Sequence, residues 1–157
     1  FYAIIDSHRY LTRVSDVMLP IIIEAATNFF LHQIRLPYDF IDSTKKRTLF
    51  AYIDIETTNG EIHRAYIGCD PMLIQTIAEI FLGEDESDEQ TLIDMLLETT
   101  NMIVGSAKVL AGELYETTLS IATPFLLSEE DVSAVRLDDS RCIGINGGEM
   151  TIALQRL

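Results

Sequence analysis

The stretch from Asp94 to Lys108 most constrains the fold, because it predicts a helix with two clearly different faces. At about 100° per residue, its apolar side chains fall on one side and its polar side chains on the other. The apolar face consists of Leu92, Leu96, Ile103, Ala107, Leu110 and Leu114. The opposite face consists of Asp94, Glu98, Asn101, Gly105 and Lys108. The pattern predicts a helix over residues 88–114 that packs its apolar stripe against a core.

The polar face of this helix combines a carboxylate, a carboxamide and a glycine. Glu98 and Asn101 are three residues apart, so they are neighbours on a helix surface. Gly105 follows one turn later and gives a partner room to approach the backbone. Such polar pairs usually only solvate a helix. The same four letters, Glu-Thr-Thr-Asn, also occur at residues 56–59, but there Gly60 follows between two alternating apolar runs, which predicts a hairpin turn.

Charge and cysteine content narrow the classes of function. The chain has 157 residues, of which 25 are acidic and 11 basic, and its net charge is −14. This acidic excess argues against nucleic acid and anionic membranes as partners. Cys69 and Cys142 suit neither a metal site nor a disulfide framework, and a reducing cytoplasm is expected. Pro20 and Glu24 interrupt the most apolar run, so no transmembrane helix is expected. A signal peptide is not expected either.

Two further helices are predicted in the first half of the chain. A buried helix is expected over residues 16–37, with Asp16 as its N-cap and Pro20 in its first turn. A shorter helix is expected over residues 70–83, between an Asp-Pro start and a Gly stop. The acidic residues 84–89 that follow are predicted to be a solvated connector rather than a metal site.

Strands account for most of the remaining chain. Alternating apolar residues predict one hairpin around Asn59–Gly60 and another around Asn146–Gly148. Residues 38–47 are predicted to be a polar loop, and residues 1–5 are either a short strand or an ordered tail. The expected strands are residues 49–56, 61–69, 116–123, 136–145 and 149–157.

These elements predict an α+β fold in two related halves. Each half has a long helix followed by strands, so we expect a mixed, mostly antiparallel sheet packed against long helices. The expected domains are an N-terminal extension over residues 1–15 and a single domain over residues 16–157. The first long helix has Glu24 and Thr27 where the second has Glu98 and Asn101, so only the second half carries the Glu/Asn pair.

Two segments of the second half form a longer motif. The first is Asp94-x-x-x-Glu98-x-x-Asn101-Met102-Ile103-x-Gly105-x-Ala107-Lys108, and the second is Ser120-Ile121-x-x-Pro124. This motif resembles the CheC/CheX/FliY family of chemotaxis phosphatases, and CheX most closely. The order of the expected elements also agrees with that family over about residues 16–157.

The resemblance implies a substrate and a role for each motif residue. The substrate is the aspartyl phosphate of a CheY-like response regulator, which supplies its own Mg²⁺. Asn101 holds a water for in-line attack, because a carboxamide can both donate and accept hydrogen bonds, and Glu98 pairs with a regulator Lys. Asp94, Gly105 and Lys108 are the expected partner contacts. The alternatives are solvation of the helix face for Asp94 and Lys108, and helix–helix packing for Gly105.

The resemblance also implies a cytoplasmic homodimer with no metal or cofactor of its own. Two classes of function stay open: a phosphatase, or a non-catalytic scaffold module of the same fold in a chemotaxis or flagellar-switch assembly. The Glu98/Asn101 pair favours the phosphatase, because a module that only binds does not need the carboxamide. Replacing Asn101 by Ala separates the two, since a phosphatase would lose turnover and keep its complex.

Overall fold

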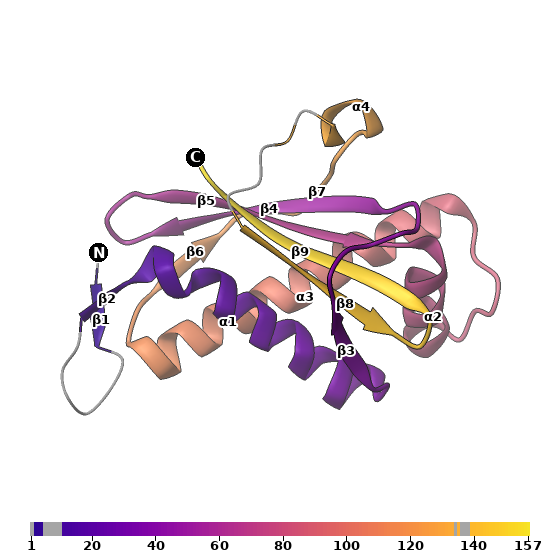
Figure 1. Cartoon of the computed structure of the whole chain (residues 1–157), viewed down its shortest axis with the longest axis horizontal. Helices are drawn as coiled ribbons and strands as arrows, with labels where there is room; N and C mark the ends of the chain where they lie inside the picture. Colours follow the sequence, from indigo (N-terminus) through magenta and orange to yellow (C-terminus); the bar gives the residue numbers. More distant parts are fainter. Residues whose placement is uncertain (1, 5–10, 134, 136–138) are drawn as a thin grey trace.

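A computed structural model of the chain describes residues 2–4, 11–133, 135 and 139–157. Its main feature is a seven-stranded sheet whose inner face packs against two long helices (Figure 1). A shorter helix lies at one end of the sheet, and a fourth, very short helix lies on the side of the sheet away from the two long ones. This arrangement confirms the predicted α+β class.

The helices lie close to where the sequence placed them. They are α1 (Val14–Asn28) with its π-helical continuation η1 (Phe29–Ile34), α2 (Pro71–Leu82), α3 (Glu89–Tyr115) and α4 (Glu129–Val132). The predicted start of the first helix is wrong, because α1 begins two residues before Asp16 and has Pro20 inside it. The helix accommodates this proline on its solvent-exposed side, while Met18 and Leu19 beside it are buried in the core.

The first long helix also corrects the expectation about membrane-spanning segments. Ser15–Ile34 is long and apolar enough to cross a membrane, judged by length and composition. Pro20 and Glu24 do not interrupt the helix, which continues through both residues. More than half of the segment is buried inside the fold, with Ala26 and Phe30 completely inaccessible. A core helix of a globular domain has this same composition.

The main sheet is antiparallel at every pairing between described residues. Its strand order is β3-β8-β9-β5-β4-β6, and β7 also pairs with β4. The strands are β3 (Tyr38–Ile41), β4 (Leu49–Thr57), β5 (Ile62–Cys69), β6 (Leu119–Ile121), β7 (Phe125–Leu126), β8 (Asp139–Ile145) and β9 (Gly148–Arg156). A separate pair, β1 (Tyr2–Ile4) and β2 (Leu11–Arg13), precedes α1.

The two edges of the main sheet differ from the sequence-based prediction. Residues 38–41 form β3 instead of the start of a loop, because they pair with β8. The strand predicted over residues 116–123 is shorter, and only β6 forms there, followed by β7 beyond Pro124. Parts of two other predicted strands, residues 1 and 5 and residues 136–138, lie outside the described residues.

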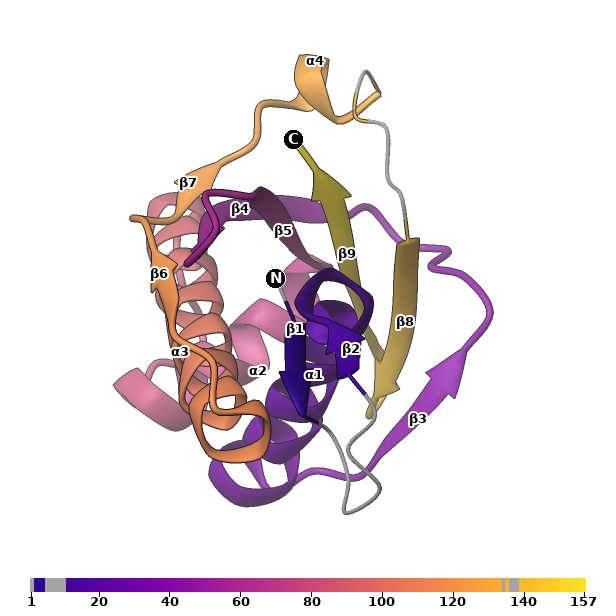
Figure 2. The same ribbon diagram turned by 90° about the vertical axis from the view of Figure 1, so that its left-hand side faces the viewer.

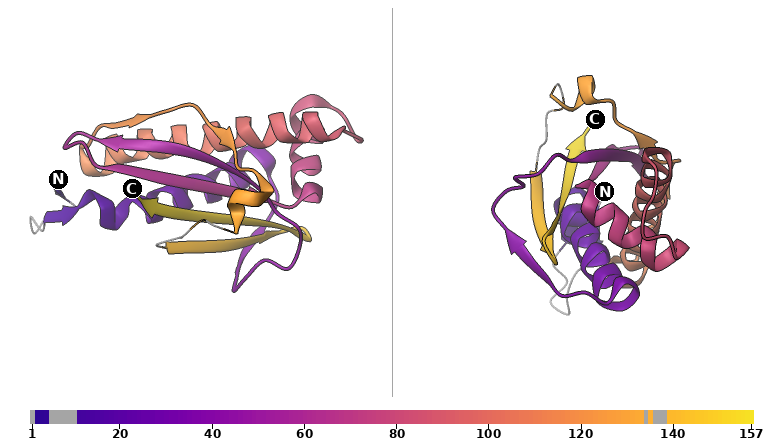
Figure 3. Two further views of the ribbon diagram at one scale, coloured as in Figure 1. Left: turned by 90° about the horizontal axis from the view of Figure 1, so that it is seen from above. Right: turned by 90° about the vertical axis from the view of Figure 1, so that its right-hand side faces the viewer.

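The sheet joins two similar halves, as predicted. The hairpin β4–β5 belongs to the first half and the hairpin β8–β9 to the second, and they meet where β5 pairs with β9. Each half also gives one strand to the other: β3 pairs with β8, and β6 pairs with β4. Figures 2 and 3 show the sheet curving around α1, with α3 beside α1 and next to the β6–β7 edge.

One core fixes how α3 is rotated against the sheet. The inward side chains of β4, among them Ile53 and Ile55, are buried as their alternation predicted. The buried residues of α3 are Met95, Leu96, Thr99, Thr100, Ile103, Val104, Ala107 and Ala111. Leu114 was expected in the apolar stripe but is 50% exposed, because it lies in the last turn of the helix. This burial directs the polar face of α3 away from the core.

Candidate functional site

The predicted site residues of α3 lie on its exposed face. Asp94, Glu98 and Asn101 are exposed, whereas Leu96 and Ile103 on the opposite side are fully buried. Glu98 and Asn101 are therefore neighbours one turn apart on the surface of a helix that the core holds in place.

An open groove of about 560 Å³ lies between this face and the segment that joins β6 to β7. Figure 2 shows α3 running alongside these two strands. The helical wall consists of Asp94, Leu97, Glu98 and Asn101. The second wall consists of Ile121, Ala122, Thr123 and Pro124. The groove thus brings together three of the five predicted site residues.

Sequence reasoning did not identify most of the second wall. The motif segment that ends in Pro124 covers it, but no role was assigned to its members. Ala122 and Thr123 are exposed, and Ile121 and Pro124 are half-buried. The signal that could have found them was the break of an alternating strand at Pro124, next to a helix that carries the Glu/Asn pair.

Glu98 and Asn101 are available to a partner. Within the described part of the chain, neither side chain makes a hydrogen bond or an ion pair. Asp94 is more constrained, because its carboxylate accepts a hydrogen bond of 2.9 Å from Gln90 Nε2. The neighbouring Thr100 points into the core, where its hydroxyl donates to the Leu96 carbonyl at 2.8 Å.

Gly105 and Lys108 lie on the same helix but outside the groove. Lys108 is exposed and seven residues beyond Asn101, about 10 Å along the helix axis. A Cβ atom added to Gly105 would meet no atom within 4 Å, so packing inside this chain does not require a glycine there. Contact of these two residues with a partner stays a prediction.

The two other segments with a similar spacing, Glu56/Asn59 and Glu24/Thr27, cannot form the same site. Glu56 lies on β4 and Asn59 lies in the turn that follows, as the Asn-Gly pair predicted. In the first half, Thr27 is buried and its hydroxyl donates to the Glu24 carbonyl at 3.0 Å. Neither of these two positions therefore repeats the exposed arrangement of Glu98 and Asn101 on α3.

Cysteines and acidic residues offer no competing site among the described residues. No group of three or more His, Cys, Asp or Glu side chains there is placed to hold a metal ion. Cys69 is buried, and this burial raises the pKa of its thiol well above the usual range. Its predicted role as a small buried residue is confirmed.

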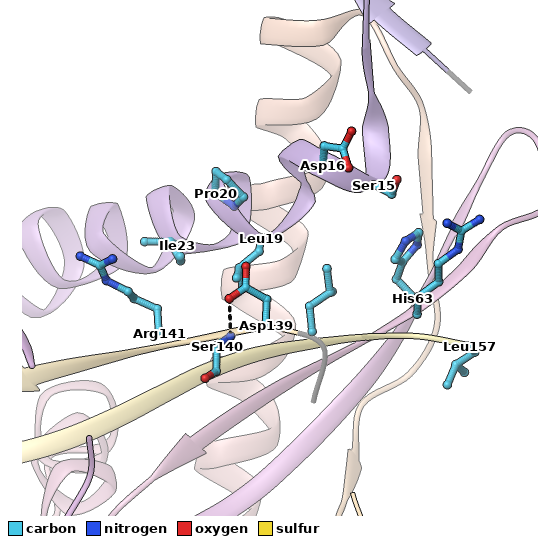
Figure 4. Close-up of a pocket in the computed structure, with 12 residues that line it drawn as sticks. Ser15, Asp16, Leu19, Pro20, Ile23, His63, Asp139, Ser140, Arg141 and Leu157 are labelled. Atoms are coloured by element: carbon cyan, nitrogen blue, oxygen red, sulfur yellow. Dashed lines mark hydrogen bonds between the residues drawn. The ribbon is translucent and has the colours of Figure 1, made fainter. Parts of the chain in front are cut away.

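A larger cavity of about 830 Å³ lies elsewhere, between the first turns of α1 and the strands β5, β8 and β9 (Figure 4). The guanidinium groups that line it already have partners. Arg141 lies over the ring of Phe40 at 4.2 Å, and Arg156 pairs with Glu61 at 2.7 Å. None of the predicted site residues lines this cavity.

Solved structures resemble this fold over most of its length. CheX from Vibrio vulnificus has a TM-score of 0.70 at 17% identity, with 88% of this chain and 96% of that chain covered. The CheX–CheY–BeF3–Mg²⁺ complex from Borrelia burgdorferi has a TM-score of 0.63 at 13% identity, with 88% of this chain and 97% of that chain covered. FliY from Thermotoga maritima has a TM-score of 0.53 at 18% identity, with 89% of this chain and 87% of that chain covered. At these identities the comparison shows a shared fold.

The family assignment comes from the sequence. A search among curated protein sequences finds no match. The family model described as chemotaxis phosphatase CheX matches residues 55–146, which is more than half of the 157-residue chain. The matched region contains the whole of α3 and both walls of the groove. The chain therefore belongs to the CheX family of chemotaxis phosphatases.

Proposed function

We propose that this protein hydrolyses the aspartyl phosphate of a CheY-like response regulator. The observation that carries the proposal is the Glu98/Asn101 pair, which is exposed and not engaged by other described residues, in a groove of a CheX-family fold. The similar CheX from Borrelia burgdorferi forms a complex with CheY, which supports a regulator of the same type as the partner.

Asn101 acts by positioning water. An aspartyl phosphate is a mixed anhydride and is already activated, and the regulator brings the Mg²⁺ that balances the phosphoryl charge. Hydrolysis then needs a water held in line with the bond that breaks. The Asn101 carboxamide can donate one hydrogen bond and accept another, so it can hold that water without removing its proton. A hundredfold acceleration requires about 2.7 kcal/mol of transition-state stabilisation, which positioning can supply.

Glu98 acts by placing the helix over the regulator. Its carboxylate lies one turn from Asn101 and can form a charge-assisted hydrogen bond with a regulator Lys. This bond fixes the distance between Asn101 and the phosphoryl group. Asp94 extends the same acidic wall, while Gly105 and Lys108 contact the regulator farther along α3. The active form is a homodimer in the cytoplasm.

The test is loss of phosphate from a panel of phosphorylated CheY-like regulators with Mg²⁺ present. Each regulator is measured alone, with wild-type protein, and with a Ser106→Ala control, since Ser106 is an exposed α3 residue outside the groove. The proposal expects wild type and control to speed phosphate loss equally from at least one regulator. Binding to a phosphorylated regulator without any acceleration would instead establish the scaffold function.

A further inference from the structure

The edge strand beside α3 contains one extra residue opposite the Glu98/Asn101 pair. In β6, Ile121 pairs with Ile55, and in β7, Phe125 pairs with Tyr52. Residues 122–124 of the edge strand therefore lie opposite only residues 53–54 of β4. This is a β-bulge, a feature that bends a strand and changes the direction of its side chains. Its residues Ala122, Thr123 and Pro124 line the groove.

Backbone hydrogen bonds hold the edge strand to β4 at the start of this bulge and again beyond β7. The Ala122 N–H donates to the Asp54 carbonyl at 2.9 Å, and the Leu127 N–H donates to the Phe50 carbonyl at 2.8 Å. The bulge is thus attached to β4 before and after the extra residue. It is a defined wall of the groove, placed by the sheet that also carries the core.

Side chains on the outer face of the sheet support the same segment. The Asp54 carboxylate accepts two hydrogen bonds from Arg64, at 2.7 and 3.0 Å. The Arg64 guanidinium lies 4.3 Å from the centre of the Tyr52 ring, and that ring lies 5.8 Å from the ring of Phe125. Arg64 therefore braces the strand residues to which both ends of the bulge are joined.

The two walls of the groove offer different chemistry. The α3 wall carries the carboxylates of Asp94 and Glu98, whereas the bulge has no charged group and has an exposed hydroxyl on Thr123. That hydroxyl makes no hydrogen bond with any described residue. A hydroxyl can donate and accept, so it suits backbone N–H and C=O groups as well as side chains.

A CheY-like regulator presents a matching surface. It is an open α/β protein, and in such proteins the site is built from loops at the carboxyl ends of the strands. Loops expose backbone donors and acceptors. A regulator whose Lys meets Glu98 therefore brings loop backbone towards the second wall of the same groove.

We propose that this bulge is a docking wall for the phosphorylated regulator, on which the Thr123 hydroxyl bonds the loops around the phosphorylation site. The inference rests on the proposed function and specifies how the partner is held. Thr123 is a positioning residue that strengthens the complex without touching the reacting atoms. Its loss raises KM and leaves kcat unchanged.

The experiment measures kcat and KM for a phosphorylated regulator that the wild type dephosphorylates. Thr123→Val removes the hydroxyl and keeps the shape, and should raise KM about threefold to tenfold, as expected for one lost hydrogen bond. Thr123→Ser restores the hydroxyl and should restore KM. The matched control is Thr118→Val, at an exposed position outside the groove just before β6.

A deletion tests the shape of the wall. Removing Thr123 lets Ala122 face Asp54 and Pro124 face Ile53, which makes the pairing with β4 continuous. We expect KM to rise more than tenfold, while kcat at saturation and the thermal unfolding midpoint stay near wild type. Removing Glu86 from the exposed connector is the control for a one-residue deletion.

The outcomes separate this inference from the proposed function. Unchanged KM in Thr123→Val and in a folded deletion variant overturns the docking wall, and so does a fall in kcat at unchanged KM. If the wild type binds a regulator but speeds no hydrolysis, the proposed function fails. The wall is then judged from Kd, which Thr123→Val must raise. If the deletion variant does not fold, the KM values of Thr123→Val and Thr123→Ser decide whether the bulge is a docking wall.

Discussion

Asn101 and Glu98 differ from the polar residues around them because their side chains make no hydrogen bond or ion pair with any described residue. Thr99 and Thr100 are buried, and Asp94 is bonded to Gln90. The two exposed groups add nothing to the core, so replacing them should change activity much more than stability.

Replacing Glu98 by Gln tests its proposed charge pairing. The variant keeps the size and hydrogen-bonding capacity of the side chain and loses the charge, so we expect KM for the phosphorylated regulator to rise about tenfold. Added salt should raise KM of the wild type more than that of the variant. The control is Glu113→Gln, an exposed α3 residue outside the groove. Equal salt dependence of wild type and Glu98→Gln would rule out the charge pair.

Gly105 gives a prediction in which stability and binding change in opposite directions. A Cβ there meets nothing within the chain, so Gly105→Ala should stabilise the protein by about 0.5–1 kcal/mol in urea unfolding. If the regulator approaches the backbone at Gly105, the same change should raise KM. Gly112→Ala is the matched control, because a Cβ at that α3 position meets only the Thr117 carbonyl, at 3.8 Å. It should stabilise α3 without affecting KM, and identical KM values for both variants would remove Gly105 from the interface.

Helices and strands that local residues determine could be predicted from the sequence, whereas those that depend on distant partners could not. Asp70, Pro71 and Gly83 specify both ends of α2 by themselves, and the structure has these ends where they were predicted. The edge strands depend on partners far away in the sequence: β3 pairs with β8, about 100 residues later. No local pattern in residues 38–41 indicates that pairing.

The two walls of the groove also differ in how far the sequence predicts them. Periodicity alone placed Glu98 and Asn101 together on one exposed helical face, and the structure has them there. The strand break at Pro124 marks where the second wall lies, but its bulged shape could not be predicted, because a bulge is defined by the register between two strands. The register of β6 and β7 against β4 is visible only in the folded chain.

Asp70 links two elements and should be sensitive to mutation. Its buried carboxylate accepts the Met72 N–H at 3.1 Å as the N-cap of α2, and the Glu149 N–H of β9 at 2.6 Å. Asp70→Ala removes the cap and leaves a buried N–H without its acceptor, so we expect the free energy of unfolding to fall by about 2–4 kcal/mol. Urea unfolding measures this. The comparison is Asp88→Ala at the exposed N-cap of α3, which should lower the free energy of unfolding by less. If both variants lost the same free energy of unfolding, the contact with β9 would have no stabilising role.

At the scale of the whole molecule, the exchange of edge strands gives the sheet two different edges. One edge is β3, and the other is the β6–β7 segment that forms the groove with α3. A homodimer that joined two sheets through the β6–β7 edge would cover Asn101. A homodimer joined through the β3 edge would leave both grooves open.

We therefore expect the homodimer to form through β3. Phe40 on this strand is 45% exposed, and Phe40→Asp would place a charge on the edge through which the expected dimer would pair. Light scattering after gel filtration should show a dimer for wild type and a monomer for this variant. Leu31→Asp, at another exposed apolar position, is the control and should remain dimeric. A Phe40→Asp protein that stays dimeric would place the interface elsewhere.

Single-turnover loss of phosphate tests whether Asn101 positions the attacking water. A labelled regulator is mixed with saturating wild type or Asn101→Ala in Mg²⁺, so that only the chemical step is observed. We predict that wild type accelerates the loss about a hundredfold and that the bound Asn101→Ala complex falls to the spontaneous rate. If the saturated Asn101→Ala complex loses phosphate as fast as wild type, the carboxamide does not position the water.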